Sequence, residues 1–289
     1  MILGLVAALL SPTVELAAVG DVMLARWVAK RIERDGPAAT LKGAETAFSG
    51  ADLRVGNLEC VIGEVPLGKR KAIMLKAPSS TAAALEGRFD VLTLANNHAL
   101  DCGLPGLAST QRWLDKLGIQ PCGVAGRETI LVRKGLRIGF IGLSQFDSGG
   151  VNSLADWKPC VAALRPKVDV LVVMVHWGLE LSPKPTPLQS STAREMVASG
   201  VDLILGSHPH VLQPVEKLEE GGRKGWVAYS LGDFVFDSPT EDRRRTAVLR
   251  VRLGMSGVER LSFVPCQIQR GFPVAEKTTR PITQWPAKL

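Results

Sequence analysis

The sequence Val-Asp-Val-Leu-Val-Val-Met-Val-His at residues 168–176 is the strongest strand candidate of the chain. Apart from Asp169, every residue before His176 is apolar, and valine predominates. Such a run is typical of a strand in a parallel sheet that is buried on both faces. The stretch therefore predicts an α/β fold, and it places a histidine at the end of a buried strand.

Similar units, in which an apolar strand runs into polar residues and a helix follows, recur on both sides of this stretch. Further strands are expected at residues 14–19, 51–55, 91–95, 138–143, 203–205 and 226–230, and helices at 25–34, 107–117 and 188–198. Ser79 and Ser80 are suitable caps for a further Ala-rich helix that stops at Gly87. Residues 246–253 and 261–268 indicate a terminal antiparallel pair.

A chain of 289 residues is long enough for one large domain or two small ones. The sequence has no internal repeat or obvious linker, which favours a single domain over residues 14–270. Residues 1–13 form an apolar amino-terminal segment. Proline and charged residues dominate 271–289, where we expect a loose tail.

The stretch from Met1 to Leu10 is apolar, but no basic residue precedes it. It is also shorter than the roughly 20 residues that a membrane-spanning helix needs. As written, the sequence predicts a cytoplasmic protein. A location in the cell envelope is the alternative, if this segment is the remainder of a longer export signal or anchor.

The chain has 35 Lys and Arg residues against 28 Asp and Glu residues, a formal net charge of +7. This excess favours an anionic partner such as a phosphate, a polyanion or an acidic lipid, although a generally basic surface without a specific partner is the alternative. The basic clusters at 69–71 and 243–245 lack interleaved aromatic residues, so we expect no nucleic-acid partner. Five cysteines without CxxC spacing indicate neither a thiolate zinc site nor a disulfide framework.

Polar side chains that can bind a metal follow several of the predicted strands, and all four histidines are among them. The candidates are Asp21, Asn57, Glu59, Asn97, His98, His176, His208 and His210. Because the carboxyl ends of parallel strands share one edge of a sheet, we expect these residues to converge there.

Imidazole, carboxylate and amide donors suit one or two divalent ions, with Mn, Fe or Zn expected. Separate structural roles are the alternative, since an isolated histidine often makes only hydrogen bonds, Asn97 could cap a turn and Asp21 could cap the next helix. His98 differs from the other histidines because Asp101 follows three residues later. This pair fits a general acid oriented by a carboxylate, and a further nitrogen ligand is the alternative.

Six motifs, VGDVML, GNLE, LANNHALDCG, VHWGLE, GSHPHVLQP and YSLGDFVFD, occur in that order between residues 19 and 237. As a set they resemble the CapA, or poly-gamma-glutamate capsule biosynthesis, family of the calcineurin-like metallophosphatase superfamily. The resemblance implies a four-layer αββα sandwich with a metal centre at the strand ends. It also implies that His98 is the acid, that Asp101 is its partner, and that the metal ligands are Asp21, Glu59, Asn97, His176, His208 and His210.

Three departures from the family patterns bear on this site. Met23 stands where metallophosphatases usually have a metal-binding histidine, which leaves a single-metal site open. Asp233 stands where CapA-like proteins more usually have Asn. Lys76 replaces the arginine of an aromatic-Arg-Ala-Pro motif; Lys76 and Asn57 are expected to contact the substrate, although a solvated loop lysine is the alternative for Lys76.

The resemblance leaves two functions of different classes open. The first is a metal-dependent hydrolase, with phosphoester hydrolysis as the expected reaction, linked to capsule or poly-gamma-glutamate biosynthesis. The second is a non-catalytic assembly or export subunit that binds an anionic polymer such as polyglutamate. Association with a membrane capsule-synthesis complex is compatible with either.

Overall fold

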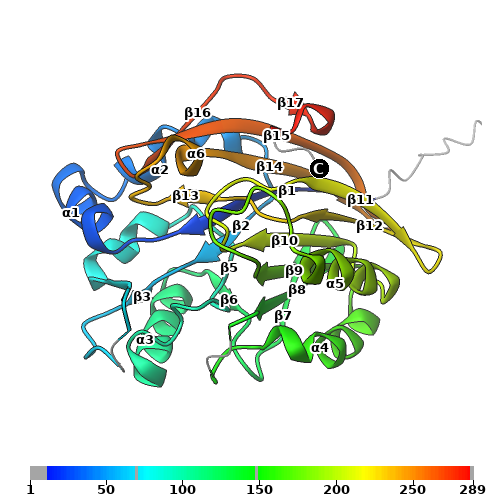
Figure 1. The fold of residues 1–289 in the computed structure, drawn as a ribbon, viewed down its shortest axis with the longest axis horizontal. Helices are drawn as coiled ribbons and strands as arrows, with labels where there is room; N and C mark the ends of the chain where they lie inside the picture. Colours follow the sequence, from blue (N-terminus) through cyan, green and yellow to red (C-terminus); the bar gives the residue numbers. More distant parts are fainter. Residues whose placement is uncertain (1–11, 69–70, 147–148, 287–289) are drawn as a thin grey trace, which may run out of the picture.

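The structure, a computed structural model that describes residues 12–68, 71–146 and 149–286, has two large β-sheets packed face to face (Figure 1). The first sheet has the strand order β16-β15-β14-β1-β2-β5-β6, with β13 paired to β1 and β17 to β15. Its strands are β1 (Val14–Val22), β2 (Leu53–Leu58), β5 (Val91–Thr93), β6 (Gln120–Cys122), β13 (Asp233–Val235), β14 (Arg245–Gly254), β15 (Gly257–Gln269), β16 (Phe272–Ala275) and β17 (Arg280–Pro281).

The second sheet has the strand order β11-β12-β10-β9-β8-β7. Its strands are β7 (Thr129–Arg133), β8 (Leu136–Ser144), β9 (Val170–His176), β10 (Leu203–Ser207), β11 (Val215–Glu220) and β12 (Arg223–Ala228). The apolar run at residues 168–176 therefore contains an interior strand, β9, which is parallel to its neighbours β8 and β10. A short parallel pair, β3 (Val61–Ile62) and β4 (Lys76–Ala77), lies outside both sheets.

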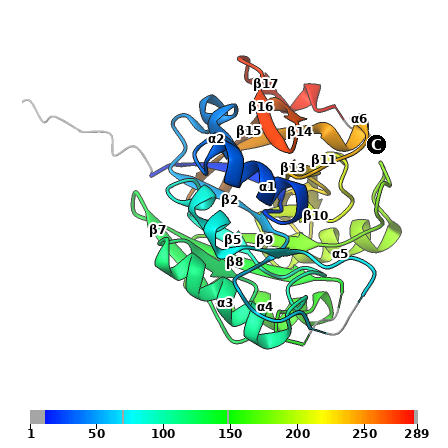
Figure 2. The ribbon, with the colours of Figure 1, turned by 90° about the vertical axis from the view of Figure 1, so that its left-hand side faces the viewer.

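Helices cover the outer faces of the two sheets, as the view from the side of α1 shows (Figure 2). The α-helices are α1 (Arg26–Asp35), α2 (Ala39–Lys42), α3 (Gly103–Lys116), α4 (Trp157–Leu164), α5 (Pro187–Ala198) and α6 (Glu241–Arg244). Short 3-10 helices span Glu45–Phe48, Ser79–Leu85, Leu154–Asp156, Arg165–Lys167 and Ile282–Gln284. Among the helices of the described ranges, none is both long and apolar enough to cross a bilayer.

The side chains of β9 point alternately into two different cores, and this explains why the fold has four layers. Val170, Val172 and Met174 pack into the core between the two sheets, whereas Leu171 and Val173 face the core formed with α4 and α5. Successive side chains of a strand point to opposite faces, so a strand that is apolar throughout needs a partner layer on each side. A third core lies under α1 and α3, on the outer face of the first sheet. The expected αββα sandwich in a single domain is confirmed.

Two helix predictions differ from the structure. Ser79 and Ser80 begin a 3-10 helix rather than an Ala-rich α-helix, and neither serine side chain caps it. Its seven residues are too few to make an isolated α-helix favourable. Helix α4 was not predicted, although Trp157 and Val161, four residues apart, both face the core.

The expected loose tail instead packs on the first sheet as far as the described chain reaches. Strands β16 and β17 both pair with β15. Trp285 is buried; its ring lies edge-on to Phe263, and its indole N–H donates to the carbonyl of Gln213 at 2.8 Å. Trp285 thus anchors the tail to the core between the sheets.

We expect Trp285→Ala to lower the free energy of unfolding by roughly 3 to 5 kcal/mol, because a buried aromatic ring and its hydrogen bond are both lost. Urea denaturation followed by circular dichroism measures the change. Thr283→Ala is the control, since Thr283 is exposed and its truncation should cost less than about 0.5 kcal/mol. Equal stability of the two variants would contradict an anchoring role for Trp285.

Candidate functional site

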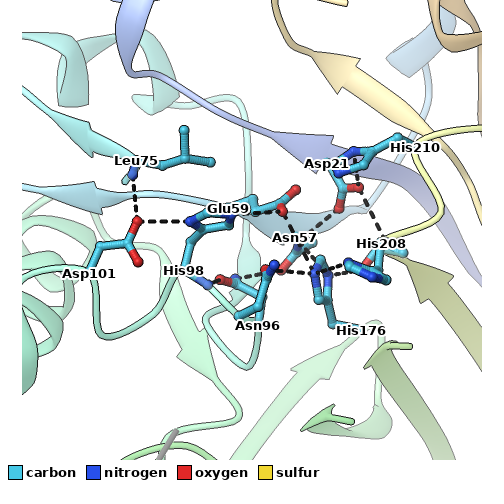
Figure 3. A network of polar contacts seen from close by, with 12 residues as sticks. Asp21, Asn57, Glu59, Leu75, Asn96, His98, Asp101, His176, His208 and His210 are labelled. Atoms are coloured by element: carbon cyan, nitrogen blue, oxygen red, sulfur yellow. Dashed lines mark hydrogen bonds and ion pairs between the residues drawn. The ribbon is translucent and has the colours of Figure 1, made fainter. Parts of the chain in front are cut away.

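Most of the predicted site residues converge at the carboxyl ends of strands from both sheets (Figure 3). Asp21 lies near the end of β1, Glu59 directly follows β2, and His98 lies in the loop after β5. His176 ends β9, while His208 and His210 follow β10. The parallel register brings these ends level, since Asp21 is opposite Asn57 and His176 is opposite Ser207. The predicted convergence is therefore present in the fold.

Glu59 is the most unusual group of this site. Its side chain is fully buried, and neither carboxylate oxygen has a hydrogen-bond partner within the described chain. Oε1 lies 3.7 Å from Nε2 of His176 and 3.9 Å from Nε2 of His98. Burial, and then the nearby Asp21 carboxylate, raise the pKa of Glu59 well above its usual value. A buried carboxylate without partners is costly, and a cation at this point would remove that cost.

His176 is oriented by contacts to both ring nitrogens. Nδ1 lies 2.9 Å from the hydroxyl of Ser207, and Nε2 lies 3.0 Å from Oδ1 of Asn97 and 3.1 Å from Nδ1 of His208. Burial, followed by the charge of His208, lowers the pKa of His176 well below its usual value, and burial lowers the pKa of His208 to about 3. Both rings are thus neutral at physiological pH, the form that binds metal.

His210 and two carboxylates form a second cluster of donors. Nδ1 of His210 donates to Oδ1 of Asp233 at 2.7 Å and lies 3.5 Å from Oδ2 of Asp21. Burial raises the pKa of Asp21 to about 6. Burial would lower the pKa of His210, but the charges of Glu59 and Asp233 outweigh it and raise the pKa to about 10. Binding of a cation by these groups would therefore release a proton.

The loop that carries His208 and His210 has a constrained backbone. Both residues have positive φ angles, 94° for His208 and 58° for His210. Non-glycine residues adopt this region rarely and at a cost, which surrounding contacts must offset. The backbone N–H of His208 donates to Asp21 at 3.3 Å, which helps to hold the loop in this conformation. In this loop the His210 imidazole lies beside Asp21 and the His208 imidazole beside His176.

Two acidic residues of the site were not among the predicted ligands. One ligand atom each from Asp21, His210 and Asp233 lie within 4.8 Å of one another, and so do atoms from Glu180, His208 and His210. Asp233 begins β13, whose parallel pairing places it opposite Asp21. Glu180 lies in the loop after β9. The available sequence signal was that Asp233 follows Gly232 in the motif YSLGDFVFD and that Glu180 ends the motif VHWGLE.

Met23 does not offer a donor to this site. Its side chain is fully buried in the core beneath α1, and its sulfur accepts a hydrogen bond from the backbone N–H of Ala25 at 3.0 Å. Position 23 is thus part of the hydrophobic core and not of the donor set. Asp233 brings a further oxygen donor to the side of Asp21.

His98 and Asp101 form the expected dyad. Nδ1 of His98 lies 2.8 Å from Oδ2 of Asp101, which also accepts from the backbone N–H of Leu75. The other oxygen of Asp101, Oδ1, pairs with the amino group of Lys71 at 2.5 Å. Burial lowers the pKa of His98, although the Asp101 carboxylate opposes this effect. Burial would raise the pKa of Asp101, but hydrogen bonds from His98 and Lys71 lower it. Asp101 therefore stays ionised and holds the imidazole ring of His98 through Nδ1. The other ring nitrogen, Nε2, is then free to act on a molecule bound in the cavity that His98 lines.

The two residues expected to contact substrate occupy other positions. Asn57 is buried behind the site, where it donates to Asp21 at 2.8 Å and accepts from Asn96 at 3.0 Å. The amino group of Lys76 donates to the carbonyl of Val65 at 3.1 Å. Neither belongs to the described residues that line the cavity over the site.

A cavity of about 290 Å³ opens onto the dyad and the donor cluster. It is lined by Arg26, Glu59, Ile73, Leu75, His98, Glu180, His210, Phe236, Asp237, Pro239 and Arg243. Because Glu59, His98 and His210 share this space, a small anion could meet the donor cluster and the dyad together.

Comparison with known proteins identifies the family. Residues 15–238 match the family model described as "Bacterial capsule synthesis protein PGA_cap". The PGA biosynthesis protein CapA of Bacillus subtilis (strain 168) is 30% identical over 281 residues, which cover 90% of this chain and 73% of that protein. The capsule biosynthesis protein CapA of Bacillus anthracis is 31% identical over 283 residues, covering 88% of this chain and 67% of that protein.

The fold also resembles that of a solved structure. A crystal structure described as a novel phosphatase from Mycoplasma pneumoniae has a TM-score of 0.57 at 13% identity, covering 89% of this chain and 94% of that one. This similarity concerns the fold alone. The sequence matches go further, and on their evidence the chain belongs to the bacterial capsule synthesis protein PGA_cap family.

Proposed function

We propose that this protein is a metal-dependent phosphoester hydrolase that acts in capsule or poly-gamma-glutamate biosynthesis. The observation that carries the proposal is the buried carboxylate of Glu59, which has no hydrogen-bond partner within the described chain and lies beside the neutral imidazole of His176. Purely structural roles for these residues leave both carboxylate oxygens of Glu59 without a hydrogen bond, with only the charge of His210 to offset their burial, whereas a divalent cation would bind them directly.

The donor set fits one or two divalent ions. Oxygen and nitrogen donors in this mixture suit Mn, Fe or Zn. The residues that would hold them are Asp21, Glu59, Asn97, His176, His208 and His210, with Asp233 as an additional donor. A bound ion would supply Lewis-acid polarisation of a phosphoryl oxygen and a water of lowered pKa.

The chain itself supplies the proton for the leaving group. His98 presents Nε2 to the cavity, while Nδ1 is held by Asp101. Lys71 and the backbone of Leu75 hold Asp101 in turn, so the ring cannot rotate away from the cavity. A histidine placed in this way can protonate a departing alkoxide oxygen as the ester bond breaks.

The relatives support a role in capsule synthesis, because the proteins matched over most of this chain are named for PGA or capsule biosynthesis. The phosphatase-like fold supports hydrolysis of a phosphoester. A polymer of glutamate is accordingly the anionic partner that we propose. A subunit that binds such a polymer without turnover is the competing function.

Metal analysis of the purified protein tests the proposal. We expect near-stoichiometric Mn, Fe or Zn in the wild type and a lower content in His208→Ala, whose metal dissociation constant should rise at least tenfold, a loss of about 1.4 kcal/mol of binding free energy. Met23→Leu is the control, since Met23 packs in the core and a volume-conserving change should keep the metal. Circular dichroism checks that each variant is folded.

Turnover of phosphate monoesters and diesters with added Mn²⁺ decides between enzyme and binding subunit. Metal-dependent hydrolysis supports the enzyme. Negligible metal in both wild type and His208→Ala, or saturable polyglutamate binding without turnover of any ester, would contradict the hydrolase.

A further inference from the structure

Two arginines line the same cavity as Glu59, His98 and His210. Arg26 begins α1, and Arg243 belongs to α6, so residues more than two hundred positions apart in the chain meet at this wall. The predicted substrate contact at Lys76 lies outside the cavity. Among the described residues that line the cavity, these two arginines therefore supply the permanent positive charge.

Both guanidinium groups pack against one aromatic ring. The Cζ atoms of Arg26 and Arg243 lie 5.4 and 5.5 Å from the centroid of the Phe236 ring. Phe236 is itself buried, and its ring centroid lies 5.1 Å from that of His210. Packing of a guanidinium on an aromatic ring restricts its motion and keeps its edge available for hydrogen bonds. Phe236 thus connects the arginine pair to the donor cluster.

Each arginine pairs with one aspartate and has further N–H donors that this pairing does not use. Arg26 uses Nη2 to pair with Asp237, and Arg243 directs Nε and Nη2 to Oδ2 of Asp233, at 3.4 and 3.3 Å. The other donors, Nε and Nη1 of Arg26 and Nη1 of Arg243, have no partner within the described chain. A guanidinium has five N–H donors in a planar fork that suits carboxylate and phosphate oxygens.

Arg26 also has a costly backbone conformation. Its φ angle is 54°, in the left-handed region that non-glycine residues rarely adopt. The side chain is 39% exposed, so burial of an apolar group does not explain the cost. Arg26 lines the cavity, and backbone strain of this kind is concentrated at functional sites.

We propose that Arg26 and Arg243 bind a second anionic group of the substrate, a carboxylate or a phosphate, beside the reacting ester. The substrate is accordingly a polyanion rather than a simple phosphomonoester. The inference rests on the proposed hydrolase function for the reacting group, whereas the anion site itself is defined by the arginines, Phe236 and the cavity.

Calorimetric titration with γ-linked triglutamate and, separately, with inorganic phosphate tests this site on the purified protein. We expect Arg26→Gln to weaken binding of at least one probe by about 10- to 100-fold, the effect of losing a charge-assisted hydrogen bond. Arg243→Gln should weaken it too, and Arg243→Lys should restore only part of the loss because lysine lacks the fork. The Arg26 variant carries more weight, since Arg243 also contacts Asp233.

Arg112→Gln is the matched control. Arg112 is exposed on α3 and is not among the described residues of the cavity wall, so the variant loses the same charge elsewhere. Loss confined to triglutamate assigns a carboxylate group, and loss confined to phosphate assigns a phosphate group. Binding of both probes by Arg26→Gln within about twofold of the wild type, an equal loss in Arg112→Gln, or no binding of either probe by the wild type would overturn the anion site.

Experiment can contradict the proposed anion site and the proposed hydrolase function independently of each other. If the wild type hydrolyses no ester but Arg26→Gln loses triglutamate binding, the hydrolase is wrong and the anion site stands. If esters are hydrolysed and Arg26→Gln binds and turns over every substrate normally, the hydrolase stands and the anion site is wrong.

Discussion

Replacement of Glu59 by glutamine is expected to abolish tight metal binding and, at the same time, to stabilise the metal-free protein. The carboxylate is fully buried and has no hydrogen-bond partner within the described chain. A neutral amide of the same size removes the buried charge, so we expect the metal-free variant to gain about 1 to 3 kcal/mol in free energy of unfolding near neutral pH. Metal content by mass spectrometry and urea denaturation of the chelated proteins measure the two effects.

The gain should depend on pH in a defined direction. Burial and Asp21 raise the pKa of Glu59 above the ordinary value of 4.5. At pH values above 4.5, Glu59 of the folded wild type binds more protons than Glu59 of the unfolded chain. The free energy of unfolding of the wild type therefore falls as pH rises from 4.5 towards the folded-state pKa. Glutamine has no such dependence. The stability difference between Glu59→Gln and wild type should therefore be small near pH 4.5 and grow at higher pH.

Glu259→Gln makes the same chemical change at an exposed position. We expect it to keep the metal and to alter stability by less than about 0.5 kcal/mol at any pH. Two results would contradict the role given to Glu59: metal retained in Glu59→Gln, or a metal-free Glu59→Gln protein that is less stable than the metal-free wild type.

The fold and the centre of the site were predictable because each buried parallel strand appears in the sequence as a nearly continuous apolar run. The apolar run before His176 ends at Val175, one residue before the end of β9, and β10 ends one residue before His208. Parallel strands in one sheet place their carboxyl ends together, so sequence order alone brings these side chains to one edge. The dyad was predictable for a different reason, since His98 and Asp101 are three residues apart in a single loop.

Other parts of the site depend on pairings between distant segments, which a local pattern does not record. Asp233 is placed by β13, a strand of three residues that is too short for any periodicity, and by its alignment with Asp21. Arg243 lies in a four-residue helix and reaches the cavity only because the chain returns past β1. The position of Lys76 in its motif predicted a contact with the substrate, but its amino group donates a hydrogen bond to the carbonyl of Val65.

The carboxyl-terminal segment shows the same limit. Proline and charged residues make 271–289 similar to a tail in composition. Its attachment depends on two short strands along β15 and on Trp285. A single tryptophan creates no hydrophobic periodicity that would predict its burial. Its aromatic neighbour, Phe263, lies more than twenty residues earlier in the chain.

His98→Gln should lower turnover by about 10²- to 10⁴-fold, the range for loss of a general acid, while the metal content stays unchanged. The ring is held through Nδ1 by Asp101, and Nε2 faces the cavity at 3.9 Å from Glu59. A proton supplied by this ring matters most for a leaving group that cannot depart as an anion. The loss should therefore be largest for alkyl phosphoesters and much smaller for nitrophenyl phosphoesters, whose leaving groups need no proton.

Asp101→Asn provides the matched test, because it keeps the shape of the dyad but removes the charge that orients and stabilises the protonated ring. We expect it to share the dependence on leaving group with His98→Gln at a smaller overall loss. If His98→Gln instead lost metal, and turnover fell equally for alkyl and nitrophenyl esters, His98 would be a further nitrogen ligand rather than the acid. The leaving-group dependence separates these roles because a ligand acts on every substrate alike, whereas an acid acts only where a proton is required.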